Sequence, residues 1–270
     1  MSLPKFLKIL VIGSLGIWVS GCTTTNPSTS DSVPSQQPVS TRPTGSPGAE
    51  RAKVHTELGS EYMHAGQYAV ALEEARIALS ADASYAPAYN LLALTHFQLG
   101  EINVAVQNIE RALSLAPGDP EFSNNYGWFL CQQPGKERNS FAHFLRAAKN
   151  PLYTSPTRAY MNLGICQGKV KDYGPAMSNL MLAFRLDPSN TLAIFNLSDL
   201  AYAQGQMAEA KQWMVELEKR IDLTSEATWL ALRIERKMGS REGEARYSSQ
   251  LRKKYVGTPE LQKLLRGEFE

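Results

Sequence analysis

The chain has 270 residues, of which 43% are hydrophobic and 20% are charged, and its formal net charge at pH 7 is +2. This composition provides ample apolar material for a buried core. The nearly balanced charge gives no support for nucleic-acid binding, because proteins of that class concentrate Lys and Arg to neutralise phosphates.

The first 21 residues have the features of a secretory signal peptide. Lys5 and Lys8 precede an apolar run from Ile9 to Val19 that is too short to span a bilayer comfortably. The run ends in Val19-Ser20-Gly21-Cys22, which resembles the lipobox of bacterial lipoproteins. That resemblance implies removal of residues 1–21 and lipidation of Cys22. The alternative is a simple secreted protein in which Cys22 is incidental.

The residues after the cysteine indicate where the protein goes and how it is held. Thr23 stands where an aspartate is the familiar signal for retention in the inner membrane. The lipoprotein resemblance therefore implies an outer-membrane protein that is anchored by lipid and faces the periplasm. Residues 22–48 are mostly Ser, Thr and Pro and contain no aromatic residue. Because such a stretch cannot bury enough surface to fold, we expect a disordered tether.

Small residues recur at a spacing of 34 in the part of the chain that follows. Gly59, Ala93 and Gly127 show this spacing, and so do Ala71 and Ala105. The period and the pattern resemble the tetratricopeptide repeat, in which each unit is a pair of antiparallel helices. The small residues fall where the two helices of a pair come closest, and a larger side chain would push them apart. The alternative is a set of unrelated amphipathic helices.

We therefore expect an all-α tetratricopeptide repeat superhelix over residues 49–258. Its six or so helix-turn-helix repeats are expected to cover residues 52–85, 86–119, 120–156, 157–190, 191–224 and 225–258. Residues 259–270 are expected to form a C-terminal tail. A superhelix of this kind has a concave groove, lined by the first helix of each pair, in which a segment of a partner protein can lie.

Asparagine recurs near one level of the expected first helices. The four positions are Asn90, Asn125, Asn162 and Asn196. These amides could reach the groove and hydrogen-bond the backbone of a bound peptide. Equally, they could cap or bridge neighbouring helices, so the ligand role and the structural role both remain open.

Two cysteines remain after Cys22. Cys131 and Cys166 are separated by 35 residues, close to the repeat period, so both fall near the ends of first helices in neighbouring repeats. Such helices pack side by side, and a disulfide between the third and fourth repeats is plausible in an oxidising periplasm. The alternative is a pair of buried free thiols.

The third and fourth repeats carry the most specific resemblance. Its residues are Asn125-Tyr126-Gly127-Trp128-Phe129-Leu130-Cys131, Ala148, Asn150-Pro151-Leu152-Tyr153, Pro156, Ala159 and Asn162-Leu163-Gly164-Ile165-Cys166. They closely resemble the hallmark stretch of the type IV pilus biogenesis and stability lipoproteins, the pilotins of the pilus secretin. One departure is Gln133-Pro134-Gly135, which interrupts the usual turn before the next helix.

That resemblance implies an outer-membrane lipoprotein with six repeats and a disulfide between Cys131 and Cys166. It also implies a function: binding the subunit of the pilus secretin, and promoting its localisation and multimer assembly in the outer membrane. Pilus biogenesis and twitching motility depend on that assembly. We expect a monomer that binds no nucleic acid. The alternative is a general lipid-anchored scaffold for another cell-envelope machine.

The sequence gives little support for an enzyme. The histidines, His55, His64, His96 and His143, show no paired metal-binding spacing. No Gly-rich phosphate loop or nucleophile motif is present, and Cys131 and Cys166 are too far apart for a CxxC redox centre. We therefore expect no catalytic residues, no metal and no cofactor.

Overall fold

The computed structural model describes residues 36–269, which form helices and no strand. Residues 1–21, Cys22 and the first part of the expected tether lie outside the described residues. The helices are η1 (Val39–Thr41, a 3-10 helix), α1 (Pro47–His64), α2 (Tyr68–Ala81), α3 (Ala86–Gln98), α4 (Ile102–Leu115), α5 (Pro120–Cys131), α6 (Glu137–Ala148), α7 (Pro156–Lys169), α8 (Tyr173–Leu186), α9 (Thr191–Ala203), α10 (Met207–Glu218), α11 (Ser225–Lys237), α12 (Arg241–Lys254) and α13 (Pro259–Arg266).

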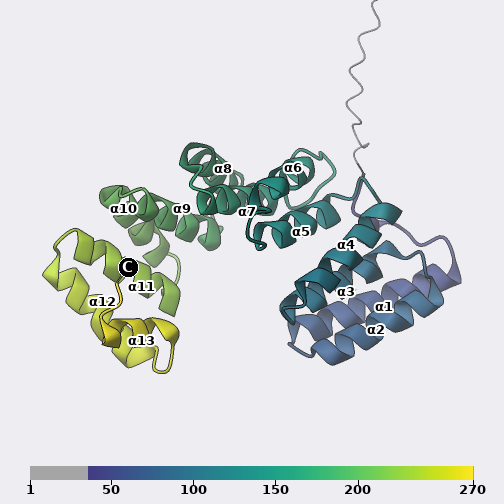
Figure 1. Ribbon diagram of the computed structural model, residues 1–270, viewed down its shortest axis with the longest axis horizontal. Helices are drawn as coiled ribbons and strands as arrows, with labels where there is room; N and C mark the ends of the chain where they lie inside the picture. The colour runs from purple at the N-terminus through teal and green to yellow at the C-terminus, as the bar shows by residue number, and fades with distance from the viewer. Residues whose placement is uncertain (1–35, 270) are drawn as a thin grey trace, which may run out of the picture. The chain divides into compact units, whose positions relative to one another are not determined.

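Helices α1 to α12 form six consecutive hairpins, from α1 with α2 to α11 with α12 (Figure 1). Each hairpin also packs against the next, because its second helix contacts the first helix of the following pair. The hairpins follow the order of the expected repeat ranges, although α1 begins at Pro47, ahead of the first range, and α7 begins at Pro156, the last residue of the third. This arrangement confirms the predicted all-α tetratricopeptide repeat superhelix.

Tight turns within the hairpins depend on residues with positive φ. Gly66, Gly100, Gly205 and Gly239 have φ between 74° and 78°, a region that glycine enters without steric cost. In the fourth hairpin Lys171 takes this position with φ 60°. The same turn is therefore made in that repeat with a side chain that disfavours it.

The hairpins close at the small residues that carry the repeat. Ala71, Ala105 and Ala176 are fully buried on second helices. A methyl group on Gly164 would lie 2.7 Å from Leu180 Cγ and 3.0 Å from the Ala176 carbonyl oxygen. These distances are shorter than carbon and oxygen tolerate, so the absence of a side chain sets the approach of α7 to α8.

The structure differs from two expectations at the ends of the repeats. Residues 259–270 contain helix α13 instead of forming only a tail, and its Leu261 packs into the last apolar cluster at 9% exposure. The Ser225 hydroxyl donates to Glu260 Oε2 at 2.7 Å, which joins α13 to α11. Helix α13 thus covers apolar surface at the end of the sixth hairpin, as terminal helices of repeat proteins do.

The second difference concerns the expected tether. Helix α1 begins at Pro47, inside the range 22–48, and Ser46 caps it by accepting from Ala49 N at 3.1 Å. Further upstream, Pro38 is buried and Val39 packs against the apolar cluster of α3 to α5. Composition alone predicted disorder because it averages over the stretch. In the structure, the burial of Pro38 and the packing of Val39 hold this part in place.

We predict that Gly164→Ala lowers the free energy of unfolding by about 1–3 kcal/mol, because α7 and α8 must move apart to admit the methyl group. Gly174→Ala is the matched control, since a methyl group there would meet no atom within 4 Å. Chemical denaturation of both variants measures the effect. Equal stability of the two would show that the close approach at Gly164 carries no energetic weight.

Candidate protein-binding groove

The first helices of successive hairpins line one face of the superhelix. Each contacts the next, in the series α1, α3, α5, α7, α9 and α11. Two cavities open among them. The first, about 210 Å³, is lined by residues of α1, α3 and α5 and also by Ser40; the second, about 230 Å³, lies chiefly between α7 and α9. These cavities make this face the candidate protein-binding groove.

A chain of asparagine amides crosses three of these helices. Asn162 Nδ2 donates to Asn124 Oδ1 at 3.1 Å, and Asn124 Nδ2 lies 3.4 Å from Asn125 Oδ1. Asn125 Nδ2 in turn donates to Asn90 Oδ1 at 2.9 Å. Asn124 and Asn125 are 2% and 8% exposed. The amides therefore bridge α3, α5 and α7, and we call this set the asparagine ladder.

The ladder separates the candidate groove residues into two groups. Asn90, Asn125 and Asn162 bond to one another's helices, as the bridging alternative expects. Asn90 also lines the first cavity. Asn196 stands apart: its amide donates to the Leu192 carbonyl of its own helix at 2.7 Å, and it lines the second cavity. Asn124 was missed by the repeat pattern, although the adjacent pair Asn124-Asn125 was a visible signal.

A segment from Gln36 to Arg42, which we call the N-terminal latch, docks beside the groove. Val39 N donates to Asp119 Oδ2 at 2.6 Å, and Asn150 Nδ2 donates to the Gln36 carbonyl at 2.8 Å. Asp119 and Asn150 are 0% and 7% exposed. Two buried polar side chains that flank the third hairpin, Asp119 before α5 and Asn150 after α6, thus hold the backbone of a segment that precedes the first hairpin.

Asp119 is also the N-cap residue of α5. Its Oδ1 accepts from Glu121 N at 2.8 Å and from Phe122 N at 3.0 Å. Burial raises the pKa of the Asp119 carboxyl, while the N–H groups of Phe122 and Val39 oppose that rise. The carboxylate is therefore a buried acceptor whose hydrogen bonds compensate part of its lost hydration.

A set of polar contacts joins the start of α7 to the start of α5. Arg158 Nη2 donates to the Tyr153 hydroxyl at 2.9 Å and forms an ion pair with Glu121 at 3.2 Å. Tyr153 is only 6% exposed, and burial raises its pKa. These contacts connect the start of α7 to the start of α5. They therefore help to hold α5, whose N-cap Asp119 binds the latch, in place.

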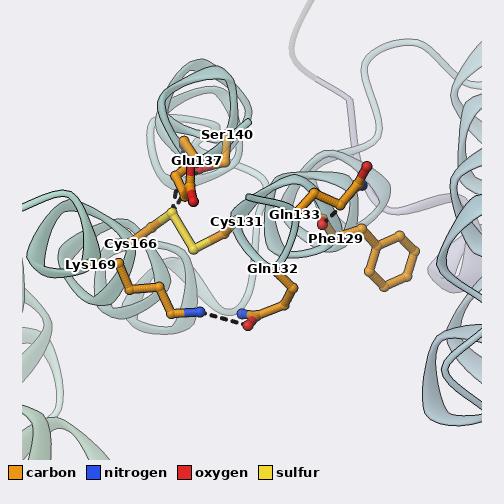
Figure 2. Close-up of a disulfide and its surroundings, with 8 residues drawn as sticks. All are labelled: Phe129, Cys131, Gln132, Gln133, Glu137, Ser140, Cys166 and Lys169. Carbon is orange, nitrogen blue, oxygen red and sulfur yellow. Dashed lines mark hydrogen bonds between the residues drawn. A yellow bond between two sulfur atoms is a disulfide. The ribbon is translucent and has the colours of Figure 1, made fainter. Parts of the chain in front are cut away.

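The two candidate disulfide residues lie together behind the groove. Cys131 ends α5 and Cys166 lies on α7, with their sulfur atoms 2.20 Å apart and their Cα atoms 5.8 Å apart (Figure 2). The Cα separation is typical of a disulfide. Ser140 Oγ of α6 lies 3.1 Å from Cys166 Sγ, so three helices meet here. The disulfide itself stays a prediction that thiol chemistry tests.

The second cavity carries groups suited to polar contacts with a partner. Asp199 lines it, and burial raises the pKa of this carboxyl while Arg233 opposes the rise. Lys169 lines it too and donates to Gln132 Oε1 at 2.6 Å (Figure 2). The Lys169 ammonium also lies 5.7 Å from the centre of the Trp128 ring. An amide, a carboxyl and an ammonium group are therefore available beside apolar walls.

Within residues 36–269 no group of three or more His, Cys, Asp or Glu side chains could hold a metal ion. His55 and His96 each pair with a single glutamate, Glu74 at 2.6 Å and Glu101 at 2.5 Å. In the same part of the chain, none of the helices has the length and apolar character needed to cross a membrane.

Known proteins resemble this chain along most of its length. Residues 56–120 and residues 157–190 each match a tetratricopeptide repeat family. The chain is 25% identical over 257 residues to the type IV pilus assembly protein PilF of Pseudomonas aeruginosa, which covers 95% of this chain and 97% of that protein. The crystal structure of PilW, described as a widely conserved type IV pilus biogenesis factor, matches this chain with a TM-score of 0.75 at 28% identity. The match covers 79% of this chain and 98% of the PilW chain. A structure of Pseudomonas aeruginosa PilF has a TM-score of 0.70 at 24% identity, with 82% and 100% covered.

We predict that Asn125→Ala lowers the free energy of unfolding by about 1–3 kcal/mol, because it leaves buried amide groups of the ladder without partners. Asn196→Ala is the control: its amide bonds only to the carbonyl of its own helix turn among the contacts described, and we expect a change within about 0.5 kcal/mol. Chemical denaturation compares them. An Asn125→Ala protein as stable as the Asn196→Ala protein would contradict a structural role for the ladder.

We predict that neither Cys131 nor Cys166 reacts with a thiol reagent in the denatured chain until a reductant is added. Replacing both by Ala should cost about 3–4 kcal/mol, because a disulfide closing a loop of this length restricts the unfolded chain by that amount. Thiol counting and chemical denaturation provide the two readings. Finding that both thiols react without reductant would contradict the predicted disulfide.

Proposed function

From the findings that this chain is a tetratricopeptide repeat protein and a homologue of the type IV pilus proteins PilF and PilW, we propose that it acts in pilus biogenesis by binding the subunit of the pilus secretin. In this proposal it promotes the localisation of the secretin in the outer membrane and its assembly into multimers. The protein performs no catalysis and works by presenting a surface.

The observation that carries this proposal is the extent of the similarity to a pilus protein. The alignment with PilF covers 95% of this chain, whereas the repeat families alone match only residues 56–120 and 157–190. Similarity beyond the repeat matches is not explained by the repeat alone. It supports inheritance of a pilus-related role along with the fold.

The candidate groove is the surface proposed to bind the secretin subunit. Repeat proteins bind partners along the concave face that their first helices form. Here the second cavity offers the Asn196 amide and the Asp199 carboxyl next to Leu200 and Ile165. A partner segment with apolar side chains and free backbone groups fits this combination, because apolar contact provides affinity and the polar groups fix its position.

The proposed anchor is the lipid on Cys22. Each buried methylene contributes about 0.8 kcal/mol, so one acyl chain binds a membrane weakly and several chains bind it stably. The three chains of a mature lipoprotein would keep the protein at the periplasmic face of the outer membrane, next to the site where secretin multimers assemble. Replacing Cys22 by Ser in the cell should therefore abolish membrane anchoring and leave binding at the groove unchanged.

We predict that Asn196→Arg weakens binding of the purified secretin subunit by at least about tenfold, since a bulky cation would fill the second cavity at the cost of about 1.4 kcal/mol or more. Asn108→Arg is the matched control: the Asn108 amide also bonds to its own helix, at Val104, but on the second helix α4. Binding to the full chain can be measured by calorimetry.

Deletion of the gene should remove secretin multimers from outer-membrane fractions, and the Asn108→Arg gene should restore them.

Two results would contradict the proposal. One is unchanged secretin binding by a folded Asn196→Arg protein, which would exclude the second cavity as the docking surface. The other is a full level of secretin multimers in the deletion strain, which would exclude the assembly role altogether.

A further inference from the structure

The N-terminal latch has the geometry of a bound ligand. Its backbone is extended at Pro38, with φ −51° and ψ 131°, and then turns through η1, where Thr41 N donates to the Pro38 carbonyl at 3.0 Å. Arg42 Nη2 donates to the Gln37 carbonyl at 2.8 Å and closes the turn. A short closed turn thus presents one carbonyl, one proline ring and one N–H group to the repeats.

The repeats meet the carbonyl and the N–H group with buried polar side chains. Asn150 donates to the Gln36 carbonyl, and Asp119 accepts from Val39 N. Between them lies Pro38, which is buried and has no N–H group that would need a partner. A proline at this position can enter an apolar site without leaving an unsatisfied donor, and no other residue type has that property.

The receiving side chains are held independently of the latch. Asn150 Oδ1 accepts from Leu152 N at 2.9 Å, and Asp119 Oδ1 caps α5, so both side chains are oriented by the third repeat itself. What the latch adds is the partner of Asp119 Oδ2. If the latch leaves, a buried carboxylate oxygen loses its hydrogen bond, which is costly and favours its replacement by another N–H group.

We propose that Asp119 and Asn150 form a peptide-recognition site that the chain's own latch occupies, and that a partner segment with proline followed by a small aliphatic residue binds there by displacing it. Recognition uses two backbone groups that every polypeptide has, together with a ring and an aliphatic side chain. Val39 supplies the aliphatic contact by packing against the cluster that contains Ala86 and Phe122. The site therefore selects for the Pro-aliphatic pair.

Displacement of the latch also changes the groove. Ser40 lines the first cavity together with Thr56 and Asn90, so removal of the latch opens that cavity at one side. The inference rests on the proposed role in binding a protein partner. It adds a second binding site, separate from the cavity that Asn196 lines, at which the latch competes with the partner. Because the latch is attached to the repeats, its high effective concentration keeps weak ligands out.

The test uses a labelled, N-terminally acetylated peptide with the sequence of residues 36–44 and the full chain carrying Val39→Pro. Proline suits the backbone of the first residue of a 3-10 turn but removes the N–H group that Asp119 accepts. Val39→Ile is the control, because it keeps both the N–H group and a branched aliphatic side chain. Fluorescence anisotropy should show at least about tenfold tighter peptide binding by the Val39→Pro protein than by the wild-type and Val39→Ile proteins, the factor expected for one hydrogen bond to a buried carboxylate.

A second peptide with proline at the position of Val39 should bind none of the three proteins. Equal binding of the first peptide by all three, or no binding by the Val39→Pro protein, would overturn the inference, provided that circular dichroism shows the wild-type helix content. Neither result involves the secretin, so failure of this site is distinguishable from failure of the proposed function.

Discussion

Close contact between paired helices is the constraint on which the rest of the structure depends. At Gly164 the backbone of α7 approaches Leu180 and the Ala176 carbonyl so closely that no side chain fits. Gly59 has the same role in the first hairpin, against Glu74 Cβ and the Ala71 carbonyl oxygen, and Gly127 has it in the third, against the Phe144 ring. Because these hairpins close in this way, their first helices are left to contact the first helices of neighbouring hairpins, and the groove follows from that arrangement.

Polar side chains then fix how neighbouring repeats meet. Buried amides cost free energy unless they find partners, so the ladder through Asn124 and Asn125 favours one relative position of α3, α5 and α7. The cysteine pair lies one to two helical turns further along α5 and α7 and would restrict the same two helices. The third and fourth repeats are therefore the most tightly connected part of the groove, and the latch docks at its edge. We expect partner binding to move the latch before it moves these helices.

The sequence predicted the periodic features and missed those that depend on single contacts. A spacing of 34 predicted the hairpins because small residues recur where paired helices come close. Gly59 and Gly127 lie at such close approaches, and Ala71, Ala93 and Ala105 are fully buried. The asparagine positions were found by the same period, but a period cannot distinguish an amide that bonds to a partner from one that bonds to the next helix. Lys171 takes a turn position that glycine holds elsewhere. The latch was missed because its stability comes from Asp119 and Asn150, which are distant in sequence and invisible to composition.

Hydrogen exchange of the full chain, measured with and without the purified pilus secretin subunit, tests most directly whether the first helices form the binding surface. We expect slower exchange in α7 and α9 when the subunit is bound, because both helices line the second cavity, and little change in α4 and α10. Protection confined to those second helices, with α7 and α9 unchanged, would contradict the groove as the site of binding.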